Sequence, residues 1–141
     1  ACPQGGGTLR PACPTPLLAP LVRTLGHQVP DDAAQISAAL VEWSGACNLI
    51  LTTGGTGLSP RDVTPDATLS VVDKQLPGIT ELLLRESIKL EPLAALSRAA
   101  AGTRGRTLIV NLPGRPKAVV ENLRILMPLL AHALNELAKE A

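Results

Sequence analysis

The chain has 141 residues and a mass of 14.6 kDa, the size of one ordinary α/β domain, which argues against two independent domains. Hydrophobic residues make up 45% of the chain, but Trp43 is its only aromatic residue, so stacking on nucleic-acid bases is excluded as a main binding mode. Thirteen basic residues oppose twelve acidic ones, and a net charge of +1 creates no field to hold a nucleic acid or an anionic membrane, which leaves small ligands as candidate partners.

The sequence carries no recognisable membrane or export signal. No stretch approaches the about 18 consecutive apolar residues of a membrane span, and the first residues lack the basic and apolar regions of a signal peptide. We therefore expect a soluble cytoplasmic protein. The cysteines, Cys2, Cys13 and Cys47, form no C-x-x-C pair and have no nearby histidine, which argues against a zinc site and a disulfide scaffold.

The amino-terminal segment changes from irregular to helical. Glycine and proline occupy eight of the first twenty residues, and both oppose regular structure, so we expect residues 1–15 to be loop or disorder. Leucines at helical spacing then predict a helix over 16–25. A single domain is expected over 16–141.

The next segment predicts two helices and a buried strand around a glycine-rich loop. Asp32, three residues before Gln35, resembles a capping box, and apolar residues follow at helical spacing as far as Trp43. Residues 48–52 form a short apolar run typical of a parallel strand buried on both faces. A threonine followed by proline then begins a helix predicted over 64–75.

The remaining segments alternate between helical and strand patterns. We expect a helix over 79–90, strands over 97–101 and 107–111 joined around Gly102 and Gly105, and a helix over 116–139 interrupted at Pro128. No internal repeat or charge block breaks the alternation. The sequence therefore predicts a three-layer α/β domain.

The loop TTGGTG, at 52–57, is the first candidate site. Its glycines can adopt positive φ and let main-chain amides approach a ligand, and phosphate or another small anion is the natural guest. The pattern is neither a Walker loop nor a Rossmann fingerprint. The structural alternative is a tight turn between strand and helix.

Charged residues follow two of the predicted strands. Asp62 lies near the loop mouth with Arg61, where it could hold Mg²⁺ through one carboxylate or could simply bond loop amides. Asp66 is expected to complement the dipole of the following helix. Lys117, after the NLPGRP segment, could reach a phosphate or could be a solvated surface lysine.

Three segments, LILTTGGTGLSPRDVTPDAT, LSRAAAGTRGRTLIVNLPGRPKAV and LMPLLAHALNEL, resemble the molybdenum cofactor adenylyltransferase family, which includes bacterial MogA and MoaB and the G domain of gephyrin. The resemblance is close over 48–137 and looser over 16–43. It implies a three-layer α/β/α MogA-like fold with a mostly parallel central sheet, usually as a homotrimer. The implied reaction joins AMP from Mg²⁺-ATP to the terminal phosphate of molybdopterin, with release of pyrophosphate, and implied partners include other proteins of molybdenum cofactor biosynthesis.

The same resemblance assigns roles to individual residues. Asp62 would be the acidic residue needed for catalysis, and Asp31 a second acidic residue that helps to hold Mg²⁺. The residues expected to bind nucleotide or pterin are Thr53, Gly54, Gly55, Thr56, Gly57, Ser97, Arg98, Asn111, Pro113, Gly114 and Lys117. Phosphoryl transfer depends on positioning and charge neutralisation, so no covalent nucleophile is required.

The amino-terminal half departs from the family pattern. Residues 1–15 lack the apolar first strand and its Ser-Asp turn, and Val29 runs directly into Pro30 where the family has another strand. We therefore expect a shortened half in which the strand over 48–52 has an unpaired edge. An incomplete sequence, a divergent enzyme and a degenerate copy all agree with this pattern.

Three functional interpretations follow. The first is a molybdopterin adenylyltransferase. The alternative is a catalytically impaired module that holds molybdopterin or nucleotide for storage, delivery or scaffolding. A third keeps the fold but assigns another nucleotide-related substrate, because small glycine-rich phosphate loops are reused.

Overall fold

The computed structural model describes residues 26–139 and divides the chain into two units, residues 1–30 and 31–141. The predicted loop over 1–15 and the predicted helix over 16–25 lie outside the described residues, and the expected domain boundary at residue 16 stays a prediction. Of the first unit only residues 26–30 are described, and they contain no helix. The elements of the second unit are, in order, α1 (Ala33–Ser44), β1 (Leu49–Thr53), α2 (Thr64–Val71), β2 (Lys74–Gln75), α3 (Pro77–Leu90), the 3₁₀ helix η1 (Pro92–Leu96), β3 (Ala101–Arg104), β4 (Thr107–Leu112) and α4 (Pro116–Ala138).

The strands form one mixed sheet in the order β1-β4-β3-β2. β1 runs parallel to β4, with Ile50 opposite Ile109, whereas β3 is antiparallel to both β4 and β2. A tight turn at Gly105, with φ of +54°, joins β3 to β4, and so short a connection can only reverse the chain direction. The α/β class is confirmed, but the sheet of residues 31–139 is mixed where the resemblance implied a mostly parallel one.

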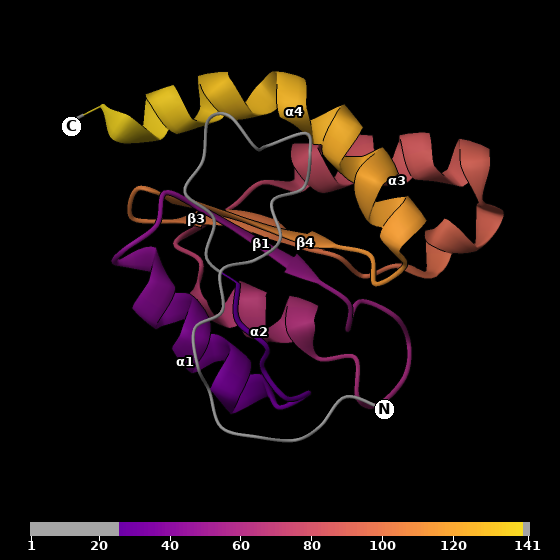
Figure 1. Cartoon of the computed structure of the whole chain (residues 1–141), viewed down its shortest axis with the longest axis horizontal. Helices are drawn as coiled ribbons and strands as arrows, with labels where there is room; N and C mark the ends of the chain where they lie inside the picture. The colour runs from indigo at the N-terminus through magenta and orange to yellow at the C-terminus, as the bar shows by residue number, and fades with distance from the viewer. Residues whose placement is uncertain (1–25, 140–141) are drawn as a thin grey trace. The chain divides into compact units, whose positions relative to one another are not determined.

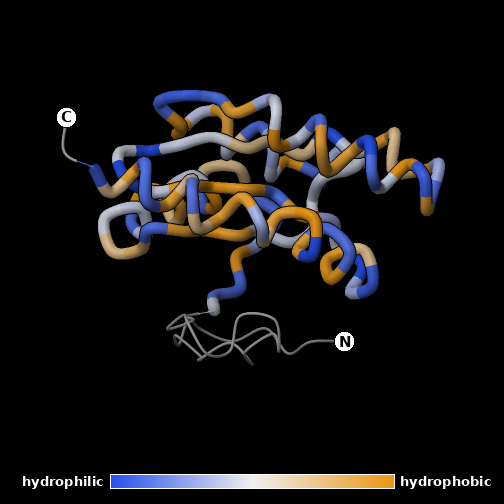
Figure 2. The backbone as a smooth tube through the Cα atoms, turned by 90° about the horizontal axis from the view of Figure 1, so that it is seen from above, coloured by the Kyte–Doolittle hydropathy of each residue, from blue (hydrophilic) through white to orange (hydrophobic). Residues whose placement is uncertain are grey.

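Helices cover both faces of the sheet and complete the three layers that the sequence predicted. α1 and α2 pack together on one face, and α3 and α4 pack together on the other (Figure 1). Figure 2 shows apolar stretches along the strands, while the helices alternate between apolar and polar residues. Helix α1 buries Ile36 and Leu40, whereas α2 buries Thr64 and Thr68 as well as apolar residues.

β4 lies at the centre of the core. Its residues 108–110 are fully buried, at 0% exposure, because helices cover both faces of the strand. A strand without a solvent face reads as a continuous apolar run, which explains the TLIV pattern. Leu123, Leu126 and Leu130 of α4 share one helix face and join the same buried cluster.

The first helix begins as the sequence predicted. Asp32 is its N-cap, and the carboxylate Oδ1 accepts the Gln35 N–H at 2.9 Å. Ile36 and Leu40 are the buried residues of this helix. Between residues 26 and 139, no helix has both the length and the apolar character needed to cross a lipid bilayer.

Two of the predictions for the helices are wrong: where one helix ends, and whether another is interrupted. The helix predicted over 64–75 ends at Val71, because the Asp73 N–H bonds to the Thr103 carbonyl and the next two residues pair with β3 as β2. α4 continues through Pro128, where an interruption was predicted. Buried leucines on both sides of this proline hold the helix against β4, and tertiary packing outweighs the lost main-chain bond.

The strand predicted over 97–101 begins only at Ala101. η1 precedes it, and in the segment between them Ala100 bonds to both the main chain and the side chain of Asn111. The Asn111 main-chain N–H donates to the Ala100 carbonyl at 2.9 Å. The Ala100 N–H donates to Asn111 Oδ1 at 3.0 Å, so a side-chain oxygen replaces a ladder carbonyl. Regular pairing of β3 with β4 therefore stops where Ala101 lies opposite Val110.

Candidate functional site

The glycine-rich loop begins where β1 ends. Gly54 and Gly55 have φ of +86° and +66°, in the left-handed region that favours glycine. The Gly54 N–H donates to the Leu112 carbonyl at 3.1 Å, and a Cβ on Gly114 would lie only 3.3 Å from Gly54 Cα. The loops that follow β1 and β4, two neighbouring parallel strands, therefore touch through glycines.

The same loop is fixed to the start of α2. The Thr64 N–H donates to the Gly55 carbonyl at 3.3 Å, and a Cβ on Gly55 would overlap the Thr64 hydroxyl. The loop thus lies against the amino-terminal end of α2, whose dipole favours an anion, although the Thr64 N–H is already bonded to Gly55 and Pro65 has no N–H. This placement supports the anion-binding interpretation of the loop, although the tight turn is also present.

Asp62 packs directly against the loop. Its Oδ2 accepts the Ser59 N–H at 3.0 Å, and a Cβ on Gly57 would come within 2.9 Å of the same oxygen. The carboxylate is half-buried. Asp62 therefore has the local bonding role that the sequence left open, and this role occupies one of the lone pairs that two carboxylate oxygens offer.

Arg98 spans the loop from the other side of the site. Its main-chain N–H donates to the Thr56 carbonyl at 2.8 Å. Its guanidinium donates to the carbonyls of Gly57 at 3.1 Å and Asp62 at 2.5 Å. Two further bonds, at 3.2 and 3.1 Å, join it to the carboxylate of Asp66. These bonds hold the pKa of Asp66 below its ordinary value and raise the pKa of Arg98.

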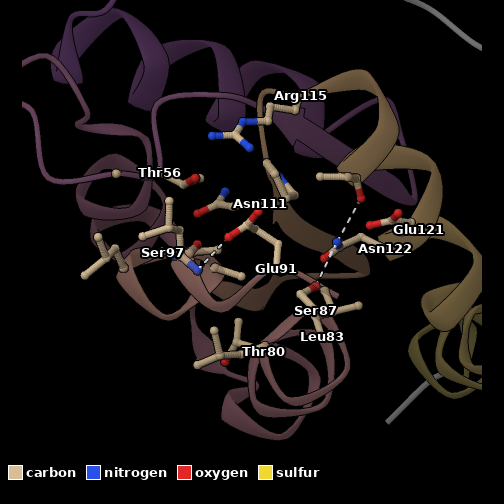
Figure 3. Close-up of a pocket in the computed structure, with 18 of the residues that line it drawn as sticks. Thr56, Thr80, Leu83, Ser87, Glu91, Ser97, Asn111, Arg115, Glu121 and Asn122 are labelled. Atoms are coloured by element: carbon tan, nitrogen blue, oxygen red, sulfur yellow. Dashed lines mark hydrogen bonds between the residues drawn. The ribbon is translucent and has the colours of Figure 1, made fainter. Parts of the chain in front are cut away.

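A cavity of about 590 Å³ opens beside the loop, within the size range of small-molecule pockets. In Figure 3, Thr56, Asn111 and Arg115 lie on one side of it, and Thr80, Leu83 and Ser87 lie on the other. The predicted site residues that line the cavity are Thr56, Gly57, Ser97, Asn111, Pro113 and Gly114. Those that do not line it are Asp31, Thr53, Gly54, Gly55, Asp62, Arg98 and Lys117.

The residues of α3 and α4 that line the cavity were not predicted from the sequence. Ser87 and Glu91 come from α3 and its end, and Glu121 and Asn122 come from α4. Asn122 Nδ2 donates to Ser87 Oγ at 3.1 Å and thereby links the two helices (Figure 3). Polar residues recurring among leucines on one face of α3, from Thr80 to Glu91, were the available signal.

Asp31, the second predicted acidic residue, forms an exposed ion pair with Arg61. Asp31 Oδ2 accepts from Arg61 Nη2 at 2.9 Å, with 45% and 81% of the two side chains exposed. Lys117 is exposed in the first turn of α4. Among residues 26–139 no group of three or more His, Cys, Asp or Glu side chains could hold a metal ion by itself. The roles of these residues in binding and catalysis stay predictions.

Left-handed glycines at the carboxyl end of a parallel strand, beside a cavity, are the arrangement by which α/β domains bind small phosphorylated ligands. Residues 15–132 match the family described as "Probable molybdopterin binding domain", and the chain belongs to this family. The resemblance stated from the sequence is therefore confirmed.

Two curated relatives are similar to large parts of the chain. The identity is 43% over 114 residues to gephyrin of Dictyostelium discoideum and 47% over 89 residues to a molybdopterin adenylyltransferase of Helicobacter pylori. These matches cover 80% and 63% of the chain, but 16% and 51% of the relatives, so the chain spans about half of the bacterial protein. The solved structure of the molybdopterin biosynthesis enzyme MoaB from Thermus thermophilus is 47% identical, with a TM-score of 0.73 over 79% of this chain and 71% of that one.

Proposed function

We propose that this chain is a molybdopterin adenylyltransferase domain of molybdenum cofactor biosynthesis. An oxygen of the terminal phosphate of molybdopterin attacks the α-phosphorus of ATP, the bond from that phosphorus to the bridging oxygen breaks, and pyrophosphate leaves. The name of the Helicobacter pylori relative supports this assignment, although the chain covers only about half of that relative.

The observation that carries the proposal is the contact between the two glycine loops. Gly54 and Gly114 touch at the ends of adjacent parallel strands, and the cavity beside them is lined from both loops. Two phosphorylated compounds must lie side by side for AMP transfer. A side chain at position 114, whose Cβ would lie 3.3 Å from Gly54 Cα, would press the loops apart at the place where phosphates of both substrates are expected to meet.

The roles of the chain's own residues follow from this arrangement. Main-chain amides of the loop bind phosphate oxygens, and Arg115, which lines the cavity, adds positive charge. Pro113 and Gly114 shape the wall against which the nucleotide lies. Such fixed dipoles and charges favour the transition state because they need no reorganisation during the reaction.

The residues also fit a bound magnesium ion, which would neutralise phosphate charge. Mg²⁺ commonly binds through one or two carboxylates and completes its oxygen ligands with water and substrate phosphates. The Asp62 carboxylate lies against the loop at Gly57 and accepts one main-chain N–H, so it can supply such a ligand. Asp31 would be the second carboxylate. The homotrimer, the partner proteins and the cytoplasmic location expected above stay predictions.

A second candidate is the binding module without catalysis. It is favoured by one observation, that neither Asp62 nor Asp31 is among the residues that line the cavity. A ligand could then be held by the loops and by the helical half of the cavity without an acidic residue at its phosphate.

One experiment separates the two candidates. The protein is incubated with molybdopterin, Mg²⁺ and ATP, and pyrophosphate and adenylylated pterin are measured against a reaction without molybdopterin. We expect both products in equal amounts. Calorimetry on the same protein measures molybdopterin binding, and binding without any product would contradict the adenylyltransferase and favour the binding module.

A further inference from the structure

We propose that Arg98 is a positioning residue that holds Asp62 and the glycine loop in their working arrangement and binds no substrate phosphate itself. This inference rests on the adenylyltransferase proposed above. It differs from the sequence-based expectation, in which Arg98 was a candidate phosphate or pterin contact.

Most of the guanidinium donors of Arg98 are already used within the protein. Nε bonds to the Gly57 carbonyl, Nη2 bonds to the Asp62 carbonyl, and both Nη atoms bond to the Asp66 carboxylate. These bonds occupy four of the five N–H donors that an arginine possesses. Only one guanidinium N–H therefore remains to bind a phosphate.

The positive charge of Arg98 is also already balanced within the protein. The carboxylate of Asp66 faces the guanidinium in a two-bond ion pair, so the positive charge of Arg98 is balanced where it stands. Arg115, which lines the cavity, is the better-placed cation for a substrate. Arg98 itself does not line the cavity.

Without the side chain of Arg98, residues 57–62 would lose their hydrogen bonds to the segment before β3. Other bonds of Ser59, Arg61 and Asp62 run within the segment itself, as from the Asp62 N–H to the Ser59 carbonyl at 2.9 Å. The link from Arg61 to Asp31 joins two exposed side chains. The guanidinium bonds to the Gly57 and Asp62 carbonyls therefore attach residues 57–62 to the segment before β3. The bond from the main-chain N–H of Arg98 to the Thr56 carbonyl does not depend on the side chain and remains in any Arg98 variant with a main-chain N–H.

Arg98 thus acts on the reaction through Asp62. Its bond to the Asp62 carbonyl fixes the main chain from which the carboxylate projects, and its bond to the Gly57 carbonyl fixes the glycine against which that carboxylate packs. Loss of these bonds would misplace the acidic group rather than remove a substrate contact. A small misplacement of this kind lowers the rate more than it lowers substrate affinity.

The kinetic test compares Arg98→Lys with Arg104→Lys as a matched control. Arg104 also donates to a main-chain carbonyl, that of Val71 at 2.8 Å, but it lies on β3 away from the loop. We expect Arg98→Lys to lower kcat about tenfold or more while KM for ATP changes less than about twofold, and Arg104→Lys to leave both unchanged. A large rise in KM at unchanged kcat would make Arg98 a substrate ligand and overturn the proposal.

A double-mutant cycle tests whether Arg98 works through Asp62. In an Asp62→Asn background, Arg98→Lys should cause a further loss of less than about twofold in kcat, because the group that it positions has already been neutralised. Losses that multiply would mean independent roles and would also overturn the proposal. If Arg98→Lys folds poorly, Asp66→Asn is used instead, because it weakens only the ion pair that holds the Arg98 guanidinium. We then expect a smaller fall in kcat with KM unchanged. An unchanged kcat would count against the proposal.

A measurement without substrate separates this inference from the proposed function. Amide hydrogen exchange over residues 57–63 should be faster in Arg98→Lys than in the wild-type protein, while exchange in α1 stays the same. A wild-type protein that makes no adenylylated pterin would contradict the proposed function but leave this result intact. Unchanged exchange over 57–63 would overturn the positioning role whatever the activity.

Discussion

Asn111 Nδ2 donates to Thr68 Oγ1 at 2.9 Å and so joins the end of β4 to α2 inside the protein. The same amide donates to Thr52 Oγ1 on β1 at 2.9 Å, and its Oδ1 accepts the Ala100 N–H at 3.0 Å. One buried side chain, 1% exposed, therefore braces three elements at the base of the candidate site. Its amide hydrogens are both used within the protein, which indicates a structural contribution besides any contact with a ligand.

Replacing Asn111 by leucine should destabilise the fold strongly. Leucine has a similar size, but it leaves the buried Thr68 hydroxyl, the half-buried Thr52 hydroxyl and one main-chain N–H without their partner, at a cost of about 2–4 kcal/mol in the free energy of unfolding. Urea denaturation measures this loss. The matched variant Thr68→Val removes one of these bonds and should cost less; an Asn111→Leu loss below that of Thr68→Val would contradict the bracing role.

Substitution of Gly55 should harm both stability and ligand binding. In Gly55→Ala, the φ of +66° strains an L-residue and the new methyl group meets the Thr64 hydroxyl, so we expect a loss of about 2 kcal/mol or more. Gly105→Ala is the matched control, because its φ of +54° is similar but a Cβ there meets nothing within 4 Å. Thermal unfolding and ATP calorimetry check both variants. Equal effects on ATP affinity would argue against a phosphate site at Gly55.

Local signals in the sequence were sufficient for the elements that hold the loop. The cap of α1 was predictable because Asp32 and Gln35 are three residues apart and bond within one turn. The strand before the loop was predictable because β1 and its flanking glycines form one continuous pattern. In each case the residues that carry the signal are neighbours in the sequence, although the pairing partner of β1 is the distant strand β4.

The features that were missed depend on residues far apart in the chain. Arg98 reaches Gly57 and Asp62 across some 40 residues, and no spacing rule predicts a side chain bonding to distant carbonyls. The cavity likewise needs α3 and α4 to lie side by side, which the bond between Ser87 and Asn122 reflects. β2 was missed because a pair of residues carries no period of its own.

Acid should loosen the segment that Arg98 holds. The pKa of Asp66 is lowered in the folded state, chiefly by its hydrogen bonds from Arg98, so this ion pair contributes stability above the ordinary pKa of aspartate. The contribution is lost as the pH falls through the lowered pKa, below about 4. Hydrogen exchange over residues 57–63, measured from neutral to acid pH, should therefore accelerate in this window.

Asp66→Asn should remove that acid step, because asparagine does not titrate. Glu86→Gln is the control: hydrogen bonds from Lys89 likewise lower the pKa of Glu86, but this pair lies on α3. It should leave exchange over 57–63 unaltered at every pH. An acid step that persists in Asp66→Asn would assign the titration to another group.

Pro128→Ala should stabilise the protein. Proline inside α4 provides no N–H for the carbonyl four residues earlier, at Arg124, and its ring strains the preceding turn. Because the residue is exposed, alanine should restore the bond at no packing cost and raise the free energy of unfolding by about 1–2 kcal/mol, after allowance for the freer unfolded chain. Urea denaturation tests this, with Leu129→Ala as a neighbouring surface control. A loss of stability would mean that α4 needs the proline.

Asp62→Asn should slow adenylylation without unfolding the loop. The asparagine carbonyl oxygen can still accept the Ser59 N–H, so the segment keeps its shape, while the negative charge that we propose for catalysis is gone. Loss of such a charge costs about 10²-fold in rate, and molybdopterin affinity should persist. Asp73→Asn is the matched control, because Asp73 also accepts a main-chain N–H, from Gly105 at 2.7 Å, but at the opposite end of β4. Pyrophosphate release measures the rate, and near-normal turnover in Asp62→Asn would exclude Asp62 from catalysis and shift attention to the residues that line the cavity.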